Sequence, residues 1–159
     1  MGLDMFLERM PRGEKPNCEF AEEVGYWRKA NAIHNWFVDH VQDGYDDCRY
    51  HNEVTKEVLE ELLDTCTKVY TSCTMMLGKV KNGAMIKDGE WVDCFETGGV
   101  VIDPTVAKEL LPTTSGFFFG GTDYDEYYVD QIENTISIIN QVLDTTDFDN
   151  EMIYYVSSW

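Results

Sequence analysis

The feature that most constrains the fold is a run of apolar residues at helical spacing within residues 25–40. At 3.6 residues per turn, one stripe collects Trp27, Ala30, Ile33, His34, Phe37, Val38 and Val41. The opposite face collects Arg28, Asn31, Asn35, Asp39 and Gln42, and the flank holds Trp36 and His40. Because the stripe is wide, we expect this helix to lie with one face on a sheet or another helix. Asp43-Gly44 marks its end, since glycine readily adopts the left-handed cap.

The other patterns predict both strands and helices. Partial alternation indicates extended segments over residues 3–8 and 20–26, and a terminal strand over 152–156 that pairs with the first. Apolar residues three and four apart predict a helix over residues 54–80. The same spacing predicts a second long helix, which begins at a Thr122 or Asp123 cap and runs to about residue 143. Asp103-Pro104 opens a short helix that Pro112 stops. Asp88-Gly89 is typical of a hairpin turn, and Gly98-Gly99 is expected to end that hairpin. The three phenylalanines at residues 117–119 lie between glycines and indicate a short buried strand.

These elements predict a single α+β domain over residues 1–159. About three main helices pack on a small, mostly antiparallel sheet that joins the N- and C-terminal strands, with an extra hairpin around residues 84–95 inside a possible insertion at 84–101. A chain of 159 residues is long enough to bury one core. Its 43% hydrophobic and 13% aromatic content argues against disorder.

The charge of the chain is large and unevenly distributed. The formal net charge is −18, and all twelve Lys and Arg residues lie between Arg9 and Lys108. From Glu109 to the end there are ten acids and no base. Such a field repels nucleic acid and anionic membranes and favours basic partners, although an acidic surface also simply keeps a protein soluble.

Cysteine usage and hydropathy indicate a cytoplasmic protein. The five cysteines form no Cys-x-x-Cys pair, and we expect reduced, mostly buried thiols. No apolar run approaches the roughly 20 residues that span a bilayer. The acids, Cys48 and His51 in residues 43–51 match neither a closed zinc pattern nor a full EF-hand loop, so we predict no metal and no cofactor.

Several residues allow either a structural or a chemical role. His34 lies in the buried stripe. It is either a core histidine with one ring nitrogen hydrogen-bonded to a neighbouring carbonyl, or a residue that contacts a ligand or acts as an acid or base. The polar face with Arg28, Lys29, Asn31 and Asn35 could hold a phosphate or carboxylate, or could simply be solvated. The glycines after residues 117–119 outline a phosphate cradle, but the carboxylates at the start of the next helix oppose an anion there. Cys48 near His51, beside Asp47, is conceivable as a nucleophile, so an enzyme remains open but disfavoured.

A set of motifs carries a family resemblance. They are Met1-Gly2-Leu3-Asp4-Met5, the run at residues 25–40, Asp46-Asp47-Cys48, Leu110-Leu111-Pro112-Thr113, Ser115-Gly116-Phe117-Phe118-Phe119-Gly120 and Thr122-Asp123-Tyr124-Asp125-Glu126. Together they resemble a family of small proteins of bacteriophages, prophages and other mobile elements, over most of the chain except about residues 79–101. The resemblance implies an intracellular, phage-linked accessory protein in a host bacterial cell. It implies no catalytic residues and no cofactor.

Three functional hypotheses follow. The first is a non-enzymatic inhibitor of a host defence complex, similar to anti-CRISPR and DNA-mimic proteins, that binds a basic protein or nucleoprotein rather than nucleic acid or membrane. Its predicted contact residues are Asp123, Asp125, Glu126, Asp130, Glu133, Asp144, Asp147 and Asp149. The second is a sponge for a nucleotide immune signal or other small anion, using Arg28, Lys29, His34, Trp36 and Phe118. The third is a small hydrolase using Cys48, His51 or His34. A homodimer is compatible with each hypothesis.

Overall fold

The structure is a computed structural model that describes residues 2–16, 19–48 and 50–159. Within them the chain forms, in order, β1 (Asp4–Pro11), β2 (Glu22–Arg28), α1 (Asn31–Val41), β3 (Asn52–Val54), α2 (Lys56–Ser72), β4 (Met75–Lys87), β5 (Glu90–Val101), α3 (Thr105–Leu110), α4 (Glu126–Thr145) and β6 (Glu151–Ser158). The predicted α+β class is confirmed. Every strand pairing is antiparallel in the two sheets that these residues form.

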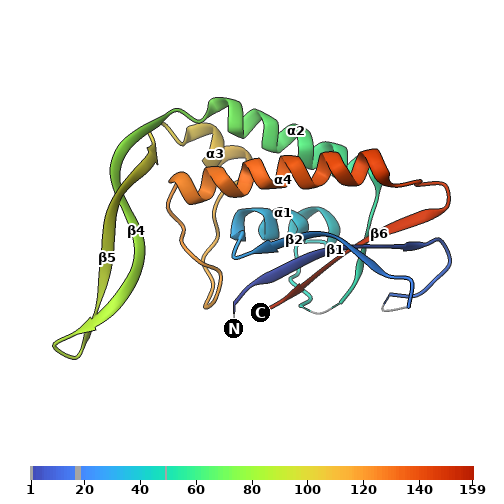
Figure 1. Cartoon of the computed structure of the whole chain (residues 1–159), viewed down its shortest axis with the longest axis horizontal. Coiled ribbons are helices and arrows are strands. Elements are labelled where there is room, and N and C mark those ends of the chain that lie inside the picture. Colours follow the sequence, from blue (N-terminus) through green and yellow to red (C-terminus); the bar gives the residue numbers. More distant parts are fainter. Residues whose placement is uncertain (1, 17–18, 49) are drawn as a thin grey trace.

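The larger sheet has the strand order β2-β1-β6-β3. Its centre is the predicted pairing of the two terminal strands: Asp4 lies opposite Ser158, and Pro11 lies opposite Glu151. Both ends of the chain therefore lie side by side, and the helices cover one face of the sheet (Figure 1).

Side-chain alternation decides which face the helices cover. Leu3, Met5 and Leu7 are fully buried and point to the helical side, whereas Phe6 and Glu8 on the other side are half-buried. Each large apolar side chain taken out of water stabilises the fold by about 1.5–3 kcal/mol. A one-residue slip of β1 would expose this set, so burial fixes the strand register.

Strand β2 and helix α4 approach each other closely. A Cβ atom on Gly25 would lie 2.8 Å from Cγ2 of Ile138, so only glycine permits this spacing. Two residues further on, the buried Trp27 donates its indole N–H to the Thr135 hydroxyl at 2.9 Å. These contacts position the end of β2, and the basic residues that follow it, beside the first half of α4.

The predicted start of the first helix is wrong. Residues 25–28 belong to β2, where Trp27 pairs with Met5, and α1 begins only at Asn31. The chain turns at Lys29, whose φ is +56° and whose N–H donates to the Leu3 carbonyl at 2.7 Å. Trp27 satisfies both a helical and an alternating pattern, and pairing with β1 decides between them.

The predicted polar face of this helix is also wrong in part. Asn31 is 2% exposed and Gln42 is 6% exposed, although both were placed opposite the apolar stripe. Trp36, placed on the flank, is 5% exposed. Asn31 is buried because its side chain bonds to the loop at residues 111–125, which covers the first turn of α1 on the side predicted to be polar.

The helix predicted over residues 54–80 is shorter in the structure, where α2 spans only Lys56–Ser72. Val54 lies in β3, and Thr55 caps α2, its hydroxyl accepting from the Val58 N–H. After Ser72 the chain enters β4, so Met75 and Met76 are strand residues. Alternating apolar residues of a strand and those of a helix overlap over such short stretches, so the sequence did not separate them.

The hairpin is confirmed but longer than predicted. Asp88 and Gly89 have φ values of +52° and +84°, as a two-residue turn with primed geometry requires. The strands extend over Met75–Lys87 and Glu90–Val101, and Gly98-Gly99 continues the pairing rather than ending it. We call this two-stranded ribbon, residues 75–101, the arm, and it stands away from the rest of the protein (Figure 1).

Two smaller predictions near α4 are corrected. Residues 117–119 form a turn rather than a buried strand: Phe117 is 90% exposed, and Phe119 alone is buried. Helix α4 is capped by Asp125 instead of Thr122 or Asp123, because the Asp125 carboxylate accepts from the Tyr128 N–H.

In the described part of the chain, no helix has both the length and the apolar composition that crossing a membrane requires.

Candidate functional site

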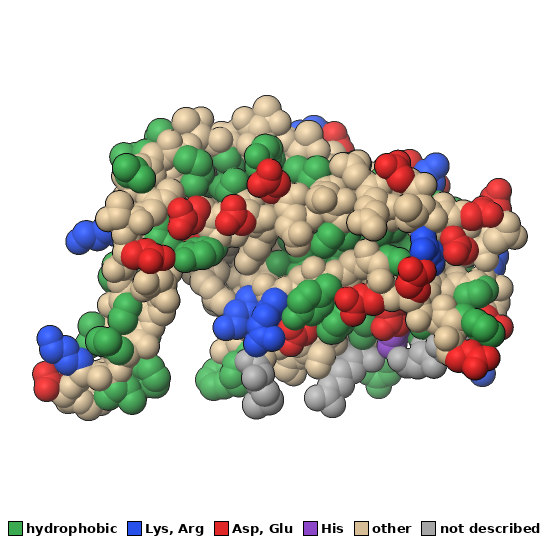
Figure 2. Space-filling view, viewed as in Figure 1, with side chains coloured by type: hydrophobic (Ala, Val, Ile, Leu, Met, Phe, Trp, Pro, Cys, Tyr) green, Lys and Arg blue, Asp and Glu red, His purple; other side chains and the backbone are tan. Residues whose placement is uncertain are grey.

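A cleft of about 410 Å³ lies between the arm and the body of the protein. Figure 2 shows the arm separated from the body by a gap, with basic side chains on the body near this gap. The lining includes Arg28, Lys29, Lys81, Gly120, Asp123 and Tyr127. It therefore joins the turn after β2, the arm, the loop at residues 111–125 and the start of α4.

The buried Asn31 side chain builds the floor of this cleft. Its amide nitrogen donates to the carbonyls of Phe119 at 3.0 Å and Gly121 at 2.8 Å. Its amide oxygen accepts from the Thr114 N–H at 2.9 Å. One side chain thus holds both ends of the loop against the first turn of α1, which no local sequence pattern indicated.

The arm is joined to the body beside the same cleft. The Gly99 N–H donates to the Glu126 carboxylate at 2.8 Å, and the Tyr127 hydroxyl donates to Glu96 at 2.9 Å. Val101 donates its N–H to the Tyr124 carbonyl at 3.0 Å. The root of the arm is therefore anchored on the start of α4.

The cleft contains charges of both signs. Arg28 lies 3.3 Å from Asp4, and Lys81 lies 2.7 Å from Asp93, while Lys29 makes no ion pair with any described residue. Asp125 is occupied by the α4 cap, and burial raises the pKa of its carboxyl. Asp123 is exposed at the rim. This set can hold an anionic group and can also accept a hydrogen bond from a ligand.

Three of the eight predicted contact carboxylates are engaged inside the protein. Asp125 caps α4, and Glu126 accepts from the arm. Asp147 organises the turn before β6, where it accepts from the Asn150 side chain at 2.8 Å and the Asp149 N–H at 3.2 Å. These hydrogen bonds, the side-chain bond first, lower the pKa of Asp147.

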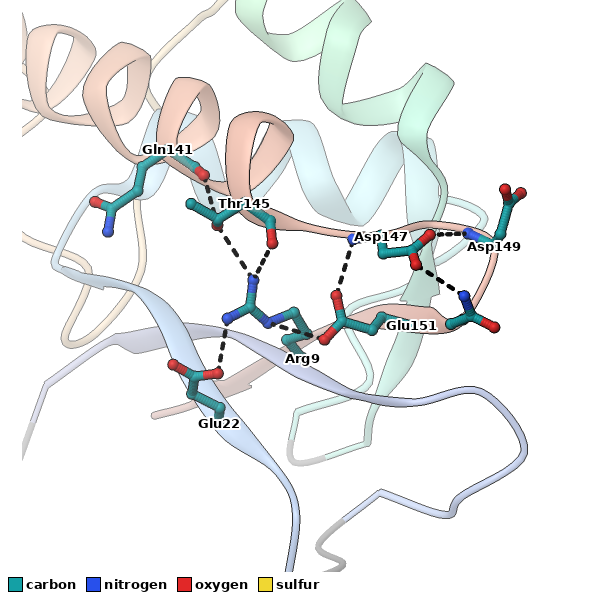
Figure 3. A network of polar contacts seen from close by, with 8 residues as sticks. Arg9, Glu22, Gln141, Thr145, Asp147, Asp149 and Glu151 are labelled. Atoms are coloured by element: carbon teal, nitrogen blue, oxygen red, sulfur yellow. Dashed lines mark hydrogen bonds and ion pairs between the residues drawn. The ribbon is translucent and has the colours of Figure 1, made fainter.

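A basic residue near this turn, Arg9, is also engaged (Figure 3). Arg9 on β1 donates to the Thr145 carbonyl at 2.9 Å, at the end of α4 where the helix dipole favours a cation. Its guanidinium also lies 2.7 Å from Glu22 and 3.7 Å from Glu151. Arg9 therefore fastens the end of α4 to the sheet.

The other five predicted carboxylates form what we call the α4 ridge: Asp123, Asp130, Glu133, Asp144 and Asp149. All five are exposed, and within residues 2–16, 19–48 and 50–159 none has an ion-pair partner. A helix of 20 residues is about 30 Å long. Its exposed middle is neutral, with Asn134, Ser137 and Gln141, so the ridge has an acidic group at each end.

The predicted ligand-binding residues are only partly brought together. Arg28 and Lys29 line the cleft, whereas His34, Trp36 and Phe118 are not among the described residues that line it. His34 is buried, with Nδ1 2.7 Å from the Tyr155 hydroxyl and Nε2 2.9 Å from Asp46. Trp36 is stacked on His40 beneath the surface. The geometry at His34 is that of a core histidine with both nitrogens bonded.

Among the described residues, Cys48 and His51, the conceivable nucleophile and base, each contact other groups. His51 Nε2 lies 3.0 Å from Glu8, and Cys48 Sγ lies 3.8 Å from the carbonyls of Ser157 and Trp159. Asp47 instead accepts from the Asn52 side chain. Across the part of the chain that is described, no group of three or more His, Cys, Asp or Glu residues has metal-binding geometry.

The arm exposes apolar side chains that the sequence analysis did not single out. Leu77, Ile86, Trp91 and Phe95 are 77%, 64%, 74% and 58% exposed. Ile86 pairs with Trp91, and the next pair, Met85 with Val92, points to the other face. Both faces of the outer arm are therefore apolar. Apolar residues on both faces of a predicted hairpin were the signal that the sequence offered for this surface.

The features above define an acidic α+β protein with an open cleft, a projecting apolar arm and a ridge of exposed carboxylates. Comparisons with protein-family models, with curated proteins and with solved structures found no match. Function is therefore inferred from these surfaces and from the family resemblance of the sequence motifs.

Proposed function

We propose that this chain is a non-enzymatic, phage-type accessory protein that inhibits a host defence complex by binding its basic, nucleic-acid-binding surface. The observation that supports the proposal is the α4 ridge, whose five exposed carboxylates have no ion-pair partner among the described residues. A channel lined by Lys and Arg binds rows of phosphates by releasing their counterions. Three of the five, Asp130, Glu133 and Asp144, lie on α4, and carboxylates on a rigid helix can occupy the same channel.

The dimensions of the ridge agree with a short stretch of nucleic acid. Asp130 and Asp144 are 14 residues apart on one helix, which corresponds to about 21 Å at 1.5 Å per residue. That length is about six base-pair steps at 3.4 Å each. The two acidic ends of the ridge would then face two basic groups of the partner, with the neutral middle between them.

The arm supports a protein partner rather than a free polycation. Protein interfaces combine buried aromatic anchors with a polar rim, and Trp91 and Phe95 have the exposure such anchors require. A two-stranded hairpin alone is marginally stable in water, so contact with a partner would also stabilise the arm. Because the arm begins beside α4, one partner can contact both surfaces.

A salt-controlled capture experiment tests the proposal. The tagged protein is incubated with bacterial lysate, and bound proteins are identified at low and high salt. We expect capture of a basic nucleic-acid-binding complex that is lost at high salt, since exposed charges are screened. The test variant combines Asp130→Asn, Glu133→Gln and Asp144→Asn.

The matched control neutralises three exposed acids elsewhere, with Glu53→Gln, Glu60→Gln and Glu61→Gln. Both variants change the net charge equally, so only a specific role of the ridge separates them. We expect the ridge variant to lose capture and the control to retain it. Equal loss in both variants, or no loss in the ridge variant, would refute the proposed mode of binding.

A further inference from the structure

Three basic side chains meet at the cleft in a chain that is otherwise strongly acidic. The sequence has 12 basic and 30 acidic residues, yet Arg28, Lys29 and Lys81 all line one cavity. Arg28 is the last residue of β2, Lys29 lies in the turn that follows, and Lys81 comes from the arm, more than fifty residues later. The tertiary structure therefore brings three cations together around one cavity, whose lining also holds Asp123 and Asp125.

The backbone holds Lys29 at this position. Its φ of +56° is unusual for a residue with a side chain and costs on the order of 1 kcal/mol. The conformation is secured by the hydrogen bond to Leu3, and the Lys29 carbonyl accepts from Gln131 at 3.3 Å. Around the side chain lie Gly2 and Gly120, where an added Cβ would come within 3.3 Å of Lys29 Cε and 3.0 Å of Lys29 Cβ, respectively. Larger residues at either glycine would crowd this lysine.

The remaining lining complements a different part of a ligand. Tyr127 is 45% exposed and offers an aromatic surface at the cleft. Asp123 at the rim is an exposed acceptor for amino or imino hydrogens. Cations, an aromatic surface and a free acceptor match the phosphate, the planar base and the exocyclic donor of a nucleotide. The volume of about 410 Å³ lies within the usual range for small-ligand sites.

We propose that the cleft is a nucleotide-binding site. Arg28, Lys29 and Lys81 hold the phosphate, Tyr127 contacts the base, and Asp123 accepts a hydrogen bond from it. Because Lys81 belongs to the arm and the other groups belong to the body, a bound nucleotide connects the two. Asp123 belongs to both this site and the α4 ridge, but the ridge variant changes Asp130, Glu133 and Asp144, which are not among the residues that line this cleft, so the two proposals are tested separately.

Isothermal titration calorimetry with a small set of compounds tests the proposal. The compounds are inorganic phosphate, adenosine, guanosine, AMP, GMP and a cyclic dinucleotide. We expect saturable binding of at least one nucleotide, at least about tenfold tighter than its nucleoside or phosphate alone, because charge-assisted hydrogen bonds and base contacts act together. Binding should also slow amide hydrogen exchange at residues 81–83 of the arm, since these residues lie at the cleft.

Matched lysine variants separate this site from general electrostatics. Lys29→Gln and Lys81→Gln are each expected to weaken nucleotide binding by roughly tenfold. Lys79→Gln and Lys87→Gln remove the same charge from exposed positions on the arm outside the cleft lining, and should leave affinity unchanged. The proposal is overturned if no nucleotide binds, if phosphate alone binds as tightly as every nucleotide, or if the control variants weaken binding as much as the cleft variants.

Discussion

Replacing Asn31 by alanine tests how the loop at residues 111–125 is held. The Asn31 side chain makes three hydrogen bonds in a 2% exposed position, two as a donor to carbonyls and one as an acceptor from an amide. Alanine removes all three and leaves the carbonyls of Phe119 and Gly121 and the Thr114 N–H without these partners. The loss therefore falls on both ends of the loop at once.

The expected effect on stability follows from these bonds. At about 1 kcal/mol net for each buried hydrogen bond, three bonds contribute about 3 kcal/mol. Alanine favours a helix over asparagine by roughly 0.5 kcal/mol, which offsets part of the loss in the first turn of α1. We therefore expect Asn31→Ala to lower the free energy of unfolding by about 2–3 kcal/mol.

Equilibrium urea unfolding measures this change. With a slope of roughly 2 kcal/mol per molar urea for a chain of this size, the midpoint should fall by about 1–1.5 M. Asn35→Ala on the same helix is the control. The Asn35 side chain donates to the exposed Asp39, its one side-chain partner among the described residues, so the change should stay within about 0.5 kcal/mol. A midpoint for Asn31→Ala within about 0.3 M of the unmodified protein would refute the assignment of the loop's stability to this side chain.

Two further predictions concern titrating groups. Burial raises the pKa of the Cys66 thiol to about 12, so in the native protein iodoacetamide at pH 8 should alkylate the half-buried Cys94 well before Cys66. Peptide mass spectrometry measures the two rates, and equal rates would contradict a closed core around α2. The pKa of Asp147 lies below its ordinary value of 3.8, so its stabilising effect is present above pH 3.8 and is lost as the pH falls through the lowered pKa. Asp147→Asn should therefore flatten the acid side of the stability profile, measured by urea unfolding at several pH values below 5, whereas an unchanged slope would show that this turn does not contribute.

The local patterns that proved reliable were those with one structural solution. Alternating residues of β1 and β6 fit only a sheet with one buried face, and pairing the two ends of the chain closed that sheet. Asp88-Gly89 fits a two-residue hairpin turn because both residues tolerate positive φ. The spacing of apolar residues in α4 likewise required a long helix with one covered side.

The candidate sites were not accessible to the same reasoning. The cleft brings together side chains from residues 28–29, 81 and 120–127, and nothing in the spacing of these segments indicates that they meet. Of the predicted ligand residues, the cleft includes Arg28 and Lys29, while His34 lies in the core, bonded to Tyr155 and Asp46. The exposure of the arm also depended on the fold, since an apolar residue in a strand pattern gives no information about whether another element covers it.

By itself, then, the amino-acid sequence determined the α+β class, the sheet that joins both ends of the chain, the turn of the arm and the unequal distribution of charge. Tertiary structure alone decided that residues 25–28 form a strand, that Asn31 is buried, and that three cations share a cavity. The physical reason is one of magnitude. Local preferences differ by less than about 1 kcal/mol per residue, so where two patterns overlap, as at Trp27, the burial of one large side chain and its pairing with a neighbouring strand decide the outcome.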